Sequence, residues 1–305
     1  MNWRLAKKRA ALLARAKVIQ EIRRFFGEGG YLEVETPLRI PAPAPEAHID
    51  ALSSADWFLH TSPELCMKRL LAAGYERIFQ ICHCWRYGER GRFHLPEFTM
   101  LEWYRTGADY HALMVECEAL VRFIACSLGY GEKLLYRDKE ISLDGPWERL
   151  TVAEAFLRFA QVSMTDALRS GLFDELMVQC IEPCLGIERP TFLYDYPASQ
   201  AALARLKRDD PTVAERFELY IGGVELANAF SELIDPTEQR ARFLLERECR
   251  LAHGQSVYPM PDKFLGEMHH IPPAAGIALG LDRLIMVLVN ASSVDDVVAF
   301  TPEEL

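Results

Sequence analysis

The chain has 305 residues, of which 50% are hydrophobic and 26% are charged, as is ordinary for a globular protein. No apolar run approaches the roughly 20 residues that cross a bilayer, and charge interrupts the basic N-terminus too often for a signal-peptide core. These features predict a cytoplasmic protein with no membrane association, and the formal charge of −10 argues against a general platform for polyanions.

The N-terminal segment predicts a basic amphipathic helix. Apolar residues recur at helical spacing over residues 4–26, and the glycines that follow Phe26 end the pattern. Residues 1–26 contain eight Lys or Arg residues and one acid, Glu21. A solvated helix face or a subunit contact is the simpler interpretation of this charge, and a local basic patch is the alternative.

Short elements follow in chain order. Residues 31–37 (YLEVETP) predict a strand, residues 40–48 an extended Pro/Ala-rich loop, and residues 57–61 a second strand. Ser62 and Pro63 open a predicted helix. The remaining predicted elements are strands at 77–86, 97–105, 191–197 and 276–280, a hairpin at 216–230, and helices at 109–129, 150–160, 199–207, 237–252, 262–270 and 281–289.

This order of elements predicts the fold class. Several strands follow one another without a helix between them, which favours an α+β fold with a mostly antiparallel sheet flanked by helices over a doubly wound parallel sheet. No repeat or low-complexity linker divides the chain. One domain over residues 1–305, beginning with the basic helix, is the simplest account.

The cysteines are scattered through apolar segments, and Cys82-His83-Cys84 is their one tight cluster. No second pair of Cys or His residues at zinc-finger spacing accompanies it. We therefore expect buried, reduced thiols. The eight cysteines are at positions 66, 82, 84, 117, 126, 180, 184 and 249.

The two strands at 77–86 and 97–105 place chemically distinctive side chains on one face each. Because side chains alternate along a strand, Cys82, Cys84 and Arg86 lie on one face of the first strand. Phe98, Met100, Glu102 and Tyr104 lie on one face of the second. The loop between the strands adds Glu89, Arg90, Arg92 and His94 at the rim. If the two faces coincide, the surface suits a ligand with phosphates, a flat ring and an amine. A surface hairpin with solvated charges is the alternative.

Further carboxylates recur in the hairpin, where Glu218, Glu225 and Glu232 are seven residues apart. Paired carboxylates can bind Mg²⁺ as it bridges phosphates, although surface acids are the alternative interpretation. Strand periodicity places Glu225 and Glu232 on opposite faces, so both can line one pocket only if a bulge or bend separates them. Glu64 could likewise be an ordinary residue of a first helical turn.

Arg283 begins a helix directly after Gly280, which is a suitable seat for phosphate, although an exposed arginine is the plainer interpretation. Neither a dinucleotide-binding glycine fingerprint nor a P-loop is present in the sequence. A nucleotide bound by this chain would therefore be held in another way.

Five segments in order resemble the catalytic core of a class II aminoacyl-tRNA synthetase of the lysyl type. They are the helix and strand ending at Pro37, TSPELCMKRL, CWRYGERGRFHLPEFTMLEWY, RFELYIGGVELANAFSEL and GIALGLDRL. The resemblance covers roughly residues 10–303, but the anticodon-binding domain of those synthetases is missing. A stand-alone core with VELANAF and Ala278 is similar to the elongation factor P (R)-β-lysine ligase family.

The resemblance implies an ATP-dependent ligase with Mg²⁺. It would activate β-lysine, or α-lysine, as an adenylate and transfer it to a lysine side chain of elongation factor P, with tRNA an unlikely partner and a homodimer expected from the first motif. Arg86 would hold the α-phosphate, Phe98 would stack on adenine, and Arg283 would bind the distal phosphates.

The remaining implied roles complete the site. Glu218 and Glu225 would hold Mg²⁺ and ATP, and Glu64, Glu102, Tyr104 and Glu232 would bind the amino groups of the substrate. The implied substrate-binding residues also include Ser62, Pro63 and Ala278, and the implied ATP-binding residues also include Tyr87, Gly88, Glu89, His94, Leu95, Leu226 and Gly280.

Two departures from the family pattern lie in the loop after Arg86. The expected Arg-x-Glu becomes Arg86-Tyr87-Gly88 with Glu89 one place later, and Leu95 replaces an Asn. Either Glu89 takes the place of the missing glutamate, which the flexible loop would allow, or the affinity for ATP is altered. The alternative functions are a lysine-activating enzyme that acts on tRNA or another acceptor, and a catalytically silent paralogue that acts as a binding module.

Overall fold

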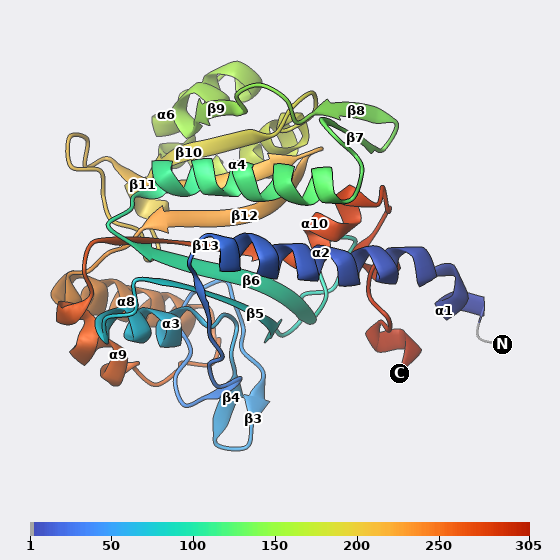
Figure 1. The fold of residues 1–305 in the computed structure, drawn as a ribbon. Helices are drawn as coiled ribbons and strands as arrows, with labels where there is room; N and C mark the ends of the chain where they lie inside the picture. Colours follow the sequence, from blue (N-terminus) through green and yellow to red (C-terminus); the bar gives the residue numbers. More distant parts are fainter. Residues whose placement is uncertain (1–2) are drawn as a thin grey trace.

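A twisted, mixed sheet of eight strands forms the centre of the computed structural model, which describes residues 3–305 (Figure 1). The strands are antiparallel except at the two edges, where β1 and β9 pair in parallel with their neighbours. In spatial order they are β1 (Leu32–Glu33), β5 (Arg77–Trp85), β6 (Glu97–Thr106), β13 (Ala274–Gly280), β12 (Val224–Ser231), β11 (Val213–Ile221), β10 (Thr191–Pro197) and β9 (Glu148–Thr151). The predicted α+β class with a mostly antiparallel sheet is confirmed.

Two long helices, α2 (Arg9–Glu28) and α4 (Tyr110–Ser127), run side by side across one face of this sheet (Figure 1). The predicted N-terminal helix is therefore present, but a separate turn of helix, α1 (Trp3–Lys7), precedes it. Helix α2 ends at Glu28, two residues beyond the predicted end at residue 26. The chain turns at Gly30, whose φ of 73° favours glycine.

Basic side chains of α2 form ion pairs and hydrogen bonds within the molecule. Arg15 pairs with Asp282 and donates to the Thr99 hydroxyl at 2.6 Å, and Arg23 donates to Glu33 at 3.0 Å. These contacts tie the helix to the sheet and to α10 (Leu281–Leu288).

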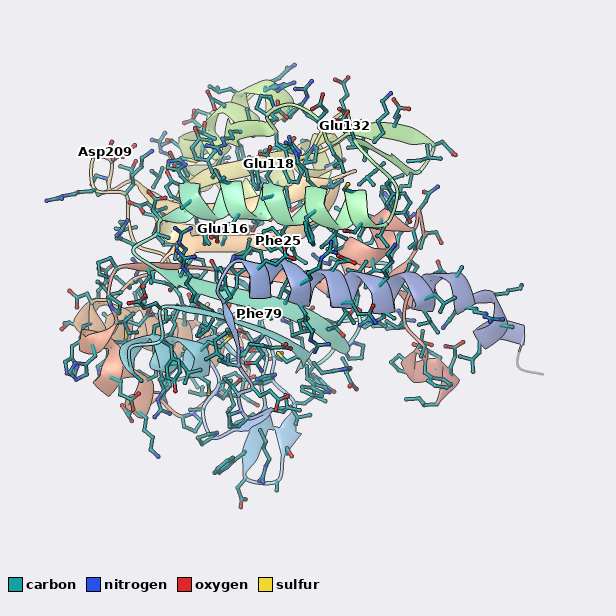
Figure 2. All side chains as sticks on the ribbon, viewed as in Figure 1. Phe25, Phe79, Glu116, Glu118, Glu132 and Asp209 are labelled. Atoms are coloured by element: carbon teal, nitrogen blue, oxygen red, sulfur yellow. The ribbon has the colours of Figure 1, made fainter. Side chains whose placement is uncertain are left out.

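Aromatic and polar contacts join these helices to the sheet. Phe26 of α2 stacks on Phe79 of β5 with ring centroids 4.7 Å apart. Glu116 of α4 accepts hydrogen bonds from Arg105 at 2.8 Å and from the Tyr31 hydroxyl at 2.9 Å. Figure 2, which labels Phe79 and Glu116, shows Glu116 on the side of α4 that faces β6. One face of the sheet is thus closed, so the site must be built on the other.

The opposite face is partly covered by a second group of helices (Figure 1). Helices α3 (Glu64–Ala72), α8 (Pro236–Ala252) and α9 (Asp262–Glu267) pack together in a separate apolar cluster. A small sheet of β2 (Arg39–Ile40), β4 (Trp57–Leu59) and β3 (Ser53–Ser54) lies beside them. Together they leave a hollow over the middle strands.

Residues 130–190 form a compact lobe at the β9 edge of the sheet (Figure 1). It contains the hairpin of β7 (Lys133–Tyr136) and β8 (Lys139–Ser142), then α5 (Val152–Ala155), α6 (Met164–Ser170) and α7 (Phe173–Leu176), with π-helical turns at Phe156–Ala160 and Met177–Ile181. The helix predicted at 150–160 therefore begins later. Its start is fixed by a capping box between Thr151 and Glu154.

One predicted element is wrong: residues 199–207 do not form a helix. A single 3-10 turn, Ala198–Gln200, is followed by extended chain in which Ala204 and Leu206 form bridges to Glu232 and Ala214. The backbone groups of this segment are satisfied by the ends of β11 and β12, which outweighs its local helical preference. Among the described residues, no helix is long and apolar enough to cross a membrane.

Candidate active site

A cavity of about 300 Å³ lies over the open face of β6, β13 and β12, and we call it the central cavity. Most of the residues predicted for substrate or ATP binding line it: Ser62, Glu64, Arg86, Glu89, His94, Leu95, Phe98, Glu102, Tyr104, Glu225, Leu226, Ala278, Gly280 and Arg283. The other predicted residues, Pro63, Tyr87, Gly88, Glu218 and Glu232, are not part of its lining. Segments far apart in sequence thus converge on one cavity.

Strand register explains this convergence. Cys84 lies opposite Phe98, and Cys82 lies opposite Met100, so the two predicted faces of β5 and β6 coincide. On the other side of β6, Ala278 lies opposite Glu102. The expectation that one surface carries these side chains is confirmed.

A β-bulge brings the acidic strand into line with the cavity. Leu219 pairs with Ala227, but Tyr220 pairs with Glu225, which leaves Leu226 as the extra residue on β12. The bulge resets the alternation of side chains, so that Glu225 and Phe230 both line the cavity. The predicted bulge is therefore present, but of the two glutamates only Glu225 lines the cavity.

Glu102 is the most deeply buried acid of the cavity, with an exposed fraction of 1%. The Ser62 hydroxyl donates to its carboxyl at 2.5 Å and the Tyr104 hydroxyl at 3.0 Å. No Lys, Arg or His within the described residues forms an ion pair with it. Burial, followed by the charge of Glu64, raises the pKa of Glu102 well above its ordinary value. This carboxyl lacks a cation.

Lys68 lies beneath the same end of the cavity and is also 1% exposed. Its Nζ is 2.6 Å from the Glu64 carboxylate and is ion-paired with Glu232. Burial lowers the pKa of Lys68, but Glu232 and Glu64 together raise it above the ordinary value. Burial raises the pKa of Glu232 to about 8, against the opposing effect of Lys68. One ammonium group is thus shared between two carboxylates.

Our sequence reasoning missed Lys68, although a signal was present. Lys68 follows Glu64 by one helical turn and lies at the same helical spacing as the buried Leu65 and Leu71. A lysine on the buried stripe of a helix requires a buried acid, because an unpaired charge there is costly. The pattern could therefore have indicated a buried ion pair.

The closely approaching backbone of β13 completes this end of the cavity. A Cβ added to Gly276 would lie 2.2 Å from a ring carbon of Tyr104 and 2.6 Å from a carboxylate oxygen of Glu232. Only glycine fits between these two side chains.

Arginine side chains define the other end of the cavity. The Arg86 guanidinium lies 5.1 Å from the ring centre of Phe98 and 3.9 Å from Glu89. Arg283 donates to the Glu225 backbone at 2.9 Å and to its carboxylate at 3.0 Å. Two guanidinium groups and an aromatic ring are suited to polyphosphate and a flat base.

His94 closes this end beside Arg283. Its Nε2 lies 2.6 Å from the Arg283 guanidinium and accepts a hydrogen bond from it. Burial and the positive charge of Arg283 lower the pKa of His94. The imidazole is therefore neutral and orients the arginine.

Glu218, a predicted metal ligand, lies behind the cavity wall. Its carboxylate accepts hydrogen bonds from Tyr196 at 2.6 Å, Tyr220 at 2.7 Å and Arg216 at 2.7 Å. Arg216 itself lines the cavity, and the sequence analysis missed it. Of the predicted pair, Glu225 is the carboxylate that borders the cavity, where among the described residues it has one donor, Arg283, and is the more accessible to a hard cation. Glu218 would have to leave three donors.

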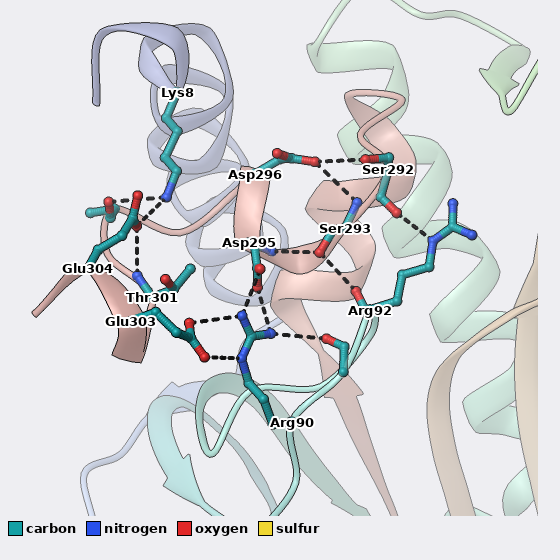
Figure 3. Close-up of polar contacts among 12 residues, drawn as sticks. Lys8, Arg90, Arg92, Ser292, Ser293, Asp295, Asp296, Thr301, Glu303 and Glu304 are labelled. Carbon is teal, nitrogen blue, oxygen red and sulfur yellow. Dashed lines mark hydrogen bonds and ion pairs between the residues drawn. The ribbon is translucent and has the colours of Figure 1, made fainter. Parts of the chain in front are cut away.

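Two arginines expected at the cavity rim point elsewhere, which corrects the prediction. Arg90 binds the carboxylates of Asp295 and Glu303 at 2.8–3.0 Å, and Arg92 donates to the Ser292 carbonyl at 2.7 Å (Figure 3). The C-terminal segment therefore holds the loop from outside. A local pattern could not reveal this, because the partners lie some 200 residues away in the sequence.

The two departures in this loop have structural counterparts. Leu95 is 4% exposed and packs in the main apolar core, so its side chain contributes to packing at this position. Glu89 lies at the cavity, and Gly88 adopts a φ of 76° that gives the loop the turn it requires. The role of Glu89 toward ATP stays a prediction.

Comparison with known proteins agrees with this arrangement. Residues 1–304 match the family described as tRNA synthetases class II (D, K and N). Among curated relatives, the "Elongation factor P--(R)-beta-lysine ligase" of Proteus mirabilis is 42% identical, with 98% of this chain and 97% of that protein covered. Proteins of the same name from Salmonella typhi and Salmonella dublin are 40% and 41% identical over the same shares. The chain therefore belongs to the class II tRNA synthetases of the D, K and N type.

Proposed function

We propose that this protein is an ATP-dependent ligase that activates (R)-β-lysine and transfers it to a lysine side chain of elongation factor P. The relatives are named for this activity, and this chain matches them over nearly their whole length. The fold is that of an adenylate-forming class. The substrate and acceptor follow from these names together with the charges in the central cavity.

The charge balance at the amino-acid end is the observation that carries the proposal. Glu64, Glu102 and Glu232 contribute three carboxyl groups, and Lys68 contributes one buried ammonium. When ionised, these four side chains have a net charge of −2, which is enough to pair with the two ammonium groups of a diamine. Glu46 also lines the cavity and adds a further negative charge when it is ionised; burial and the charge of Glu64 raise its pKa to about 7. Because buried charges must be paired, a substrate with one ammonium group would leave a carboxylate without a cation.

The arginine end supports an adenylation reaction. The substrate carboxylate attacks the α-phosphorus of ATP, a phosphorus–oxygen bond forms, and pyrophosphate leaves with the electrons of the broken bond. We assign Arg86 to the α-phosphate, Phe98 to the adenine ring and Arg283 to the distal phosphates. Catalysis would rest on positioning and on stabilisation of the charge that develops in the transition state.

The residues fit one bound Mg²⁺ through Glu225, whose carboxylate borders the cavity and is 38% exposed. Mg²⁺ would neutralise charge on the phosphates. Glu218 would join it only after release from Arg216. In the second step the ε-amine of the acceptor lysine attacks the carbonyl carbon of the adenylate, and AMP leaves.

A homodimer and a cytoplasmic location complete the proposal. Three large apolar side chains of the first motif region are exposed, namely Leu13 at 63%, Leu32 at 49% and Leu38 at 43%. Exposed apolar side chains in the segment that the resemblance assigns to the subunit interface support a subunit contact. Light scattering coupled to gel filtration would report twice the monomer mass, and a monomer at micromolar concentration would contradict the dimer.

ATP–pyrophosphate exchange with a panel of amino acids tests the proposed function. We expect exchange with (R)-β-lysine above α-lysine, and transfer of the labelled amino acid to elongation factor P but not to a variant in which its acceptor lysine is replaced. A preference for α-lysine followed by transfer to tRNA would overturn the ligase. No exchange with any amino acid would leave only a binding module.

A further inference from the structure

Three buried soft ligands meet beneath the central cavity, outside the set of residues used so far. His60 follows β4 and is 1% exposed, and Cys82 and Cys84 of β5 are 8% and 0% exposed. Their ligand atoms all lie within 4.8 Å of one another. They form a cluster that the sequence spacing did not reveal, because its histidine comes from a different segment of the chain.

The separations within this cluster match those around a tetrahedral metal ion. The two Sγ atoms are 3.9 Å apart, and the Cys84 Sγ is 3.8 Å from the His60 Nε2. Bond lengths of about 2.3 Å to sulfur and about 2.0 Å to nitrogen place tetrahedral ligands about 3.8 Å apart for two sulfurs, and about 3.5 Å apart for sulfur and nitrogen. The third separation, between the Cys82 Sγ and the His60 ring, is within 4.8 Å, so the side chains would have to draw together to close the site.

The surroundings favour a soft ion over a hard one. Met100 lies opposite Cys82 in the sheet and packs in the same small cluster with both cysteines, so its thioether would be the nearest candidate for a fourth donor. No carboxylate is a member of this three-ligand group. Thiolate, thioether and imidazole donors select ions such as Zn²⁺ and Cu⁺ over Mg²⁺ or Ca²⁺.

We propose that His60, Cys82 and Cys84 form a buried binding site for one thiophilic metal ion, Zn²⁺ or Cu⁺, under the floor of the central cavity. Binding forms two metal–sulfur bonds and one metal–nitrogen bond, and each thiol releases its proton. The Nε2 of His60 lies 2.7 Å from the His83 carbonyl and donates to it. To bind the ion, His60 must carry its proton on Nδ1 instead, and the ring must turn so that the Nε2 lone pair leaves the carbonyl and faces the two sulfurs.

The site adjoins the lining of the central cavity. Phe98 and Ala278 both pack on the cluster of Cys82, Cys84 and Met100, and both also line the cavity. An ion would thus lie next to the surface assigned to adenine and substrate, and Met100 also lines that surface. Binding of the metal can nevertheless be measured separately from the proposed ligase activity.

The full-length, reduced, metal-free protein provides the test. Zn²⁺ is titrated against a chromophoric zinc chelator, Cu⁺ against a chromophoric Cu⁺ chelator, and Co²⁺ is added as a spectroscopic substitute for Zn²⁺. We expect one equivalent of Zn²⁺ or Cu⁺ to bind, and the Co²⁺ form to show thiolate-to-metal charge transfer. Whichever of the two ions binds in this way identifies the occupant, and binding of neither overturns the proposal.

Matched variants locate the ion. Cys84→Ser and His60→Phe should each weaken binding by at least about 100-fold, as expected for loss of one ligand from a three-ligand site. Cys249→Ser is the control, because Cys249 lies 3.6 Å from the His253 imidazole in a partly exposed Cys–His pair at the C-terminal end of α8. Thermal unfolding of each metal-free variant checks that it folds. Equal binding by Cys84→Ser and the parent, or the same loss in Cys249→Ser, would contradict the site.

Discussion

Two regions of this molecule hold a cation between two carboxylates, and they behave in opposite ways. Lys68 lies between Glu64 and Glu232 and is 1% exposed, whereas Arg90 lies between Asp295 and Glu303 and is 34% exposed (Figure 3). The hydrogen bond from Arg90 lowers the pKa of Glu303 to about 2. Burial raises the pKa of Glu232 to about 8 although Lys68 is beside it.

The difference shows what burial does to a charge of the same kind. Around Arg90, water and salt screen the excess negative charge, and the ion pairs only fasten a loop. Around Lys68, the protein must either keep protons on its acids or admit a cation. The exposed set is therefore structural, and the buried set is built for a ligand.

The sharpest test of this contrast is a matched pair of variants, Lys68→Met and Arg90→Met. We expect Lys68→Met to lower the free energy of unfolding by about 3–5 kcal/mol, because it strands buried acids. Arg90→Met should cost about 1 kcal/mol or less. Urea unfolding of both proteins measures the difference, and equal losses would mean that burial does not distinguish the two sets.

Part of the stability lost in Lys68→Met should be restored by a second substitution. In the double variant Lys68→Met/Glu232→Gln, removal of one acid should recover a portion of the stability lost in Lys68→Met, since fewer charges remain unpaired. A double variant as unstable as the sum of the single variants would indicate that Lys68 acts through packing alone.

Replacement of Glu102 should separate ligand binding from stability. Glu102→Gln should reduce amino-acid-dependent pyrophosphate exchange by about 100–1,000-fold, because a buried ammonium loses its partner. The ligand-free variant should also be more stable than the parent at pH 8, since burial raises the pKa of this acid. The control is Glu132→Gln, because Glu132 is exposed to solvent just before β7 (labelled in Figure 2).

The pH dependence of the ligand-free protein should reveal Glu232. Its pKa rises from 4.5 to about 8 on folding. The folded protein therefore retains a proton that the unfolded chain loses above pH 4.5, so stability should fall as pH rises from about 4.5 to 8. Affinity for the diamine should rise over pH 6 to 8, because the ionised carboxylate pairs with an ammonium.

The variant Glu232→Gln is the reference for this titration. Urea unfolding and calorimetric binding at several pH values should give flatter profiles for the variant than for the parent. Identical profiles would show that another group titrates in this range.

The smallest expected effect concerns the choice between α- and β-lysine. Ala278 lines the cavity and lies opposite Glu102 on the neighbouring strand. Ala278→Gly removes one methyl group and should shift the ratio of exchange rates toward α-lysine by about tenfold, the scale of a single methyl discrimination. An unchanged ratio would place the selectivity elsewhere.

Much of the site was predictable because it follows from local periodicity. Alternation along the two predicted strands placed Arg86, Phe98 and Glu102 on one surface, and all three line the central cavity. The spacing of Glu225 and Glu232 suggested a bulge, and Leu226 supplies one, although Glu232 itself does not line the cavity. Such inferences succeed because strand geometry depends on near neighbours.

The remainder depends on contacts between distant segments. Arg90 points to the C-terminal segment, residues 199–207 follow the ends of two strands, and His60 approaches cysteines from another element. Lys68 was predictable only in part: the sequence shows its helical spacing, but not its second partner, Glu232. Periodicity gives the face of an element, and tertiary packing decides what that face meets.

The central claim, that the cavity is built for two ammonium groups, is tested most directly by calorimetric titration with a matched pair of ligands. (R)-β-lysine carries two amino groups, and (R)-3-aminohexanoic acid has the same chain without the terminal one. We predict that the monoamine binds at least about 100-fold more weakly, because a buried carboxylate would remain unpaired. Affinities that agree within about threefold would contradict the claim.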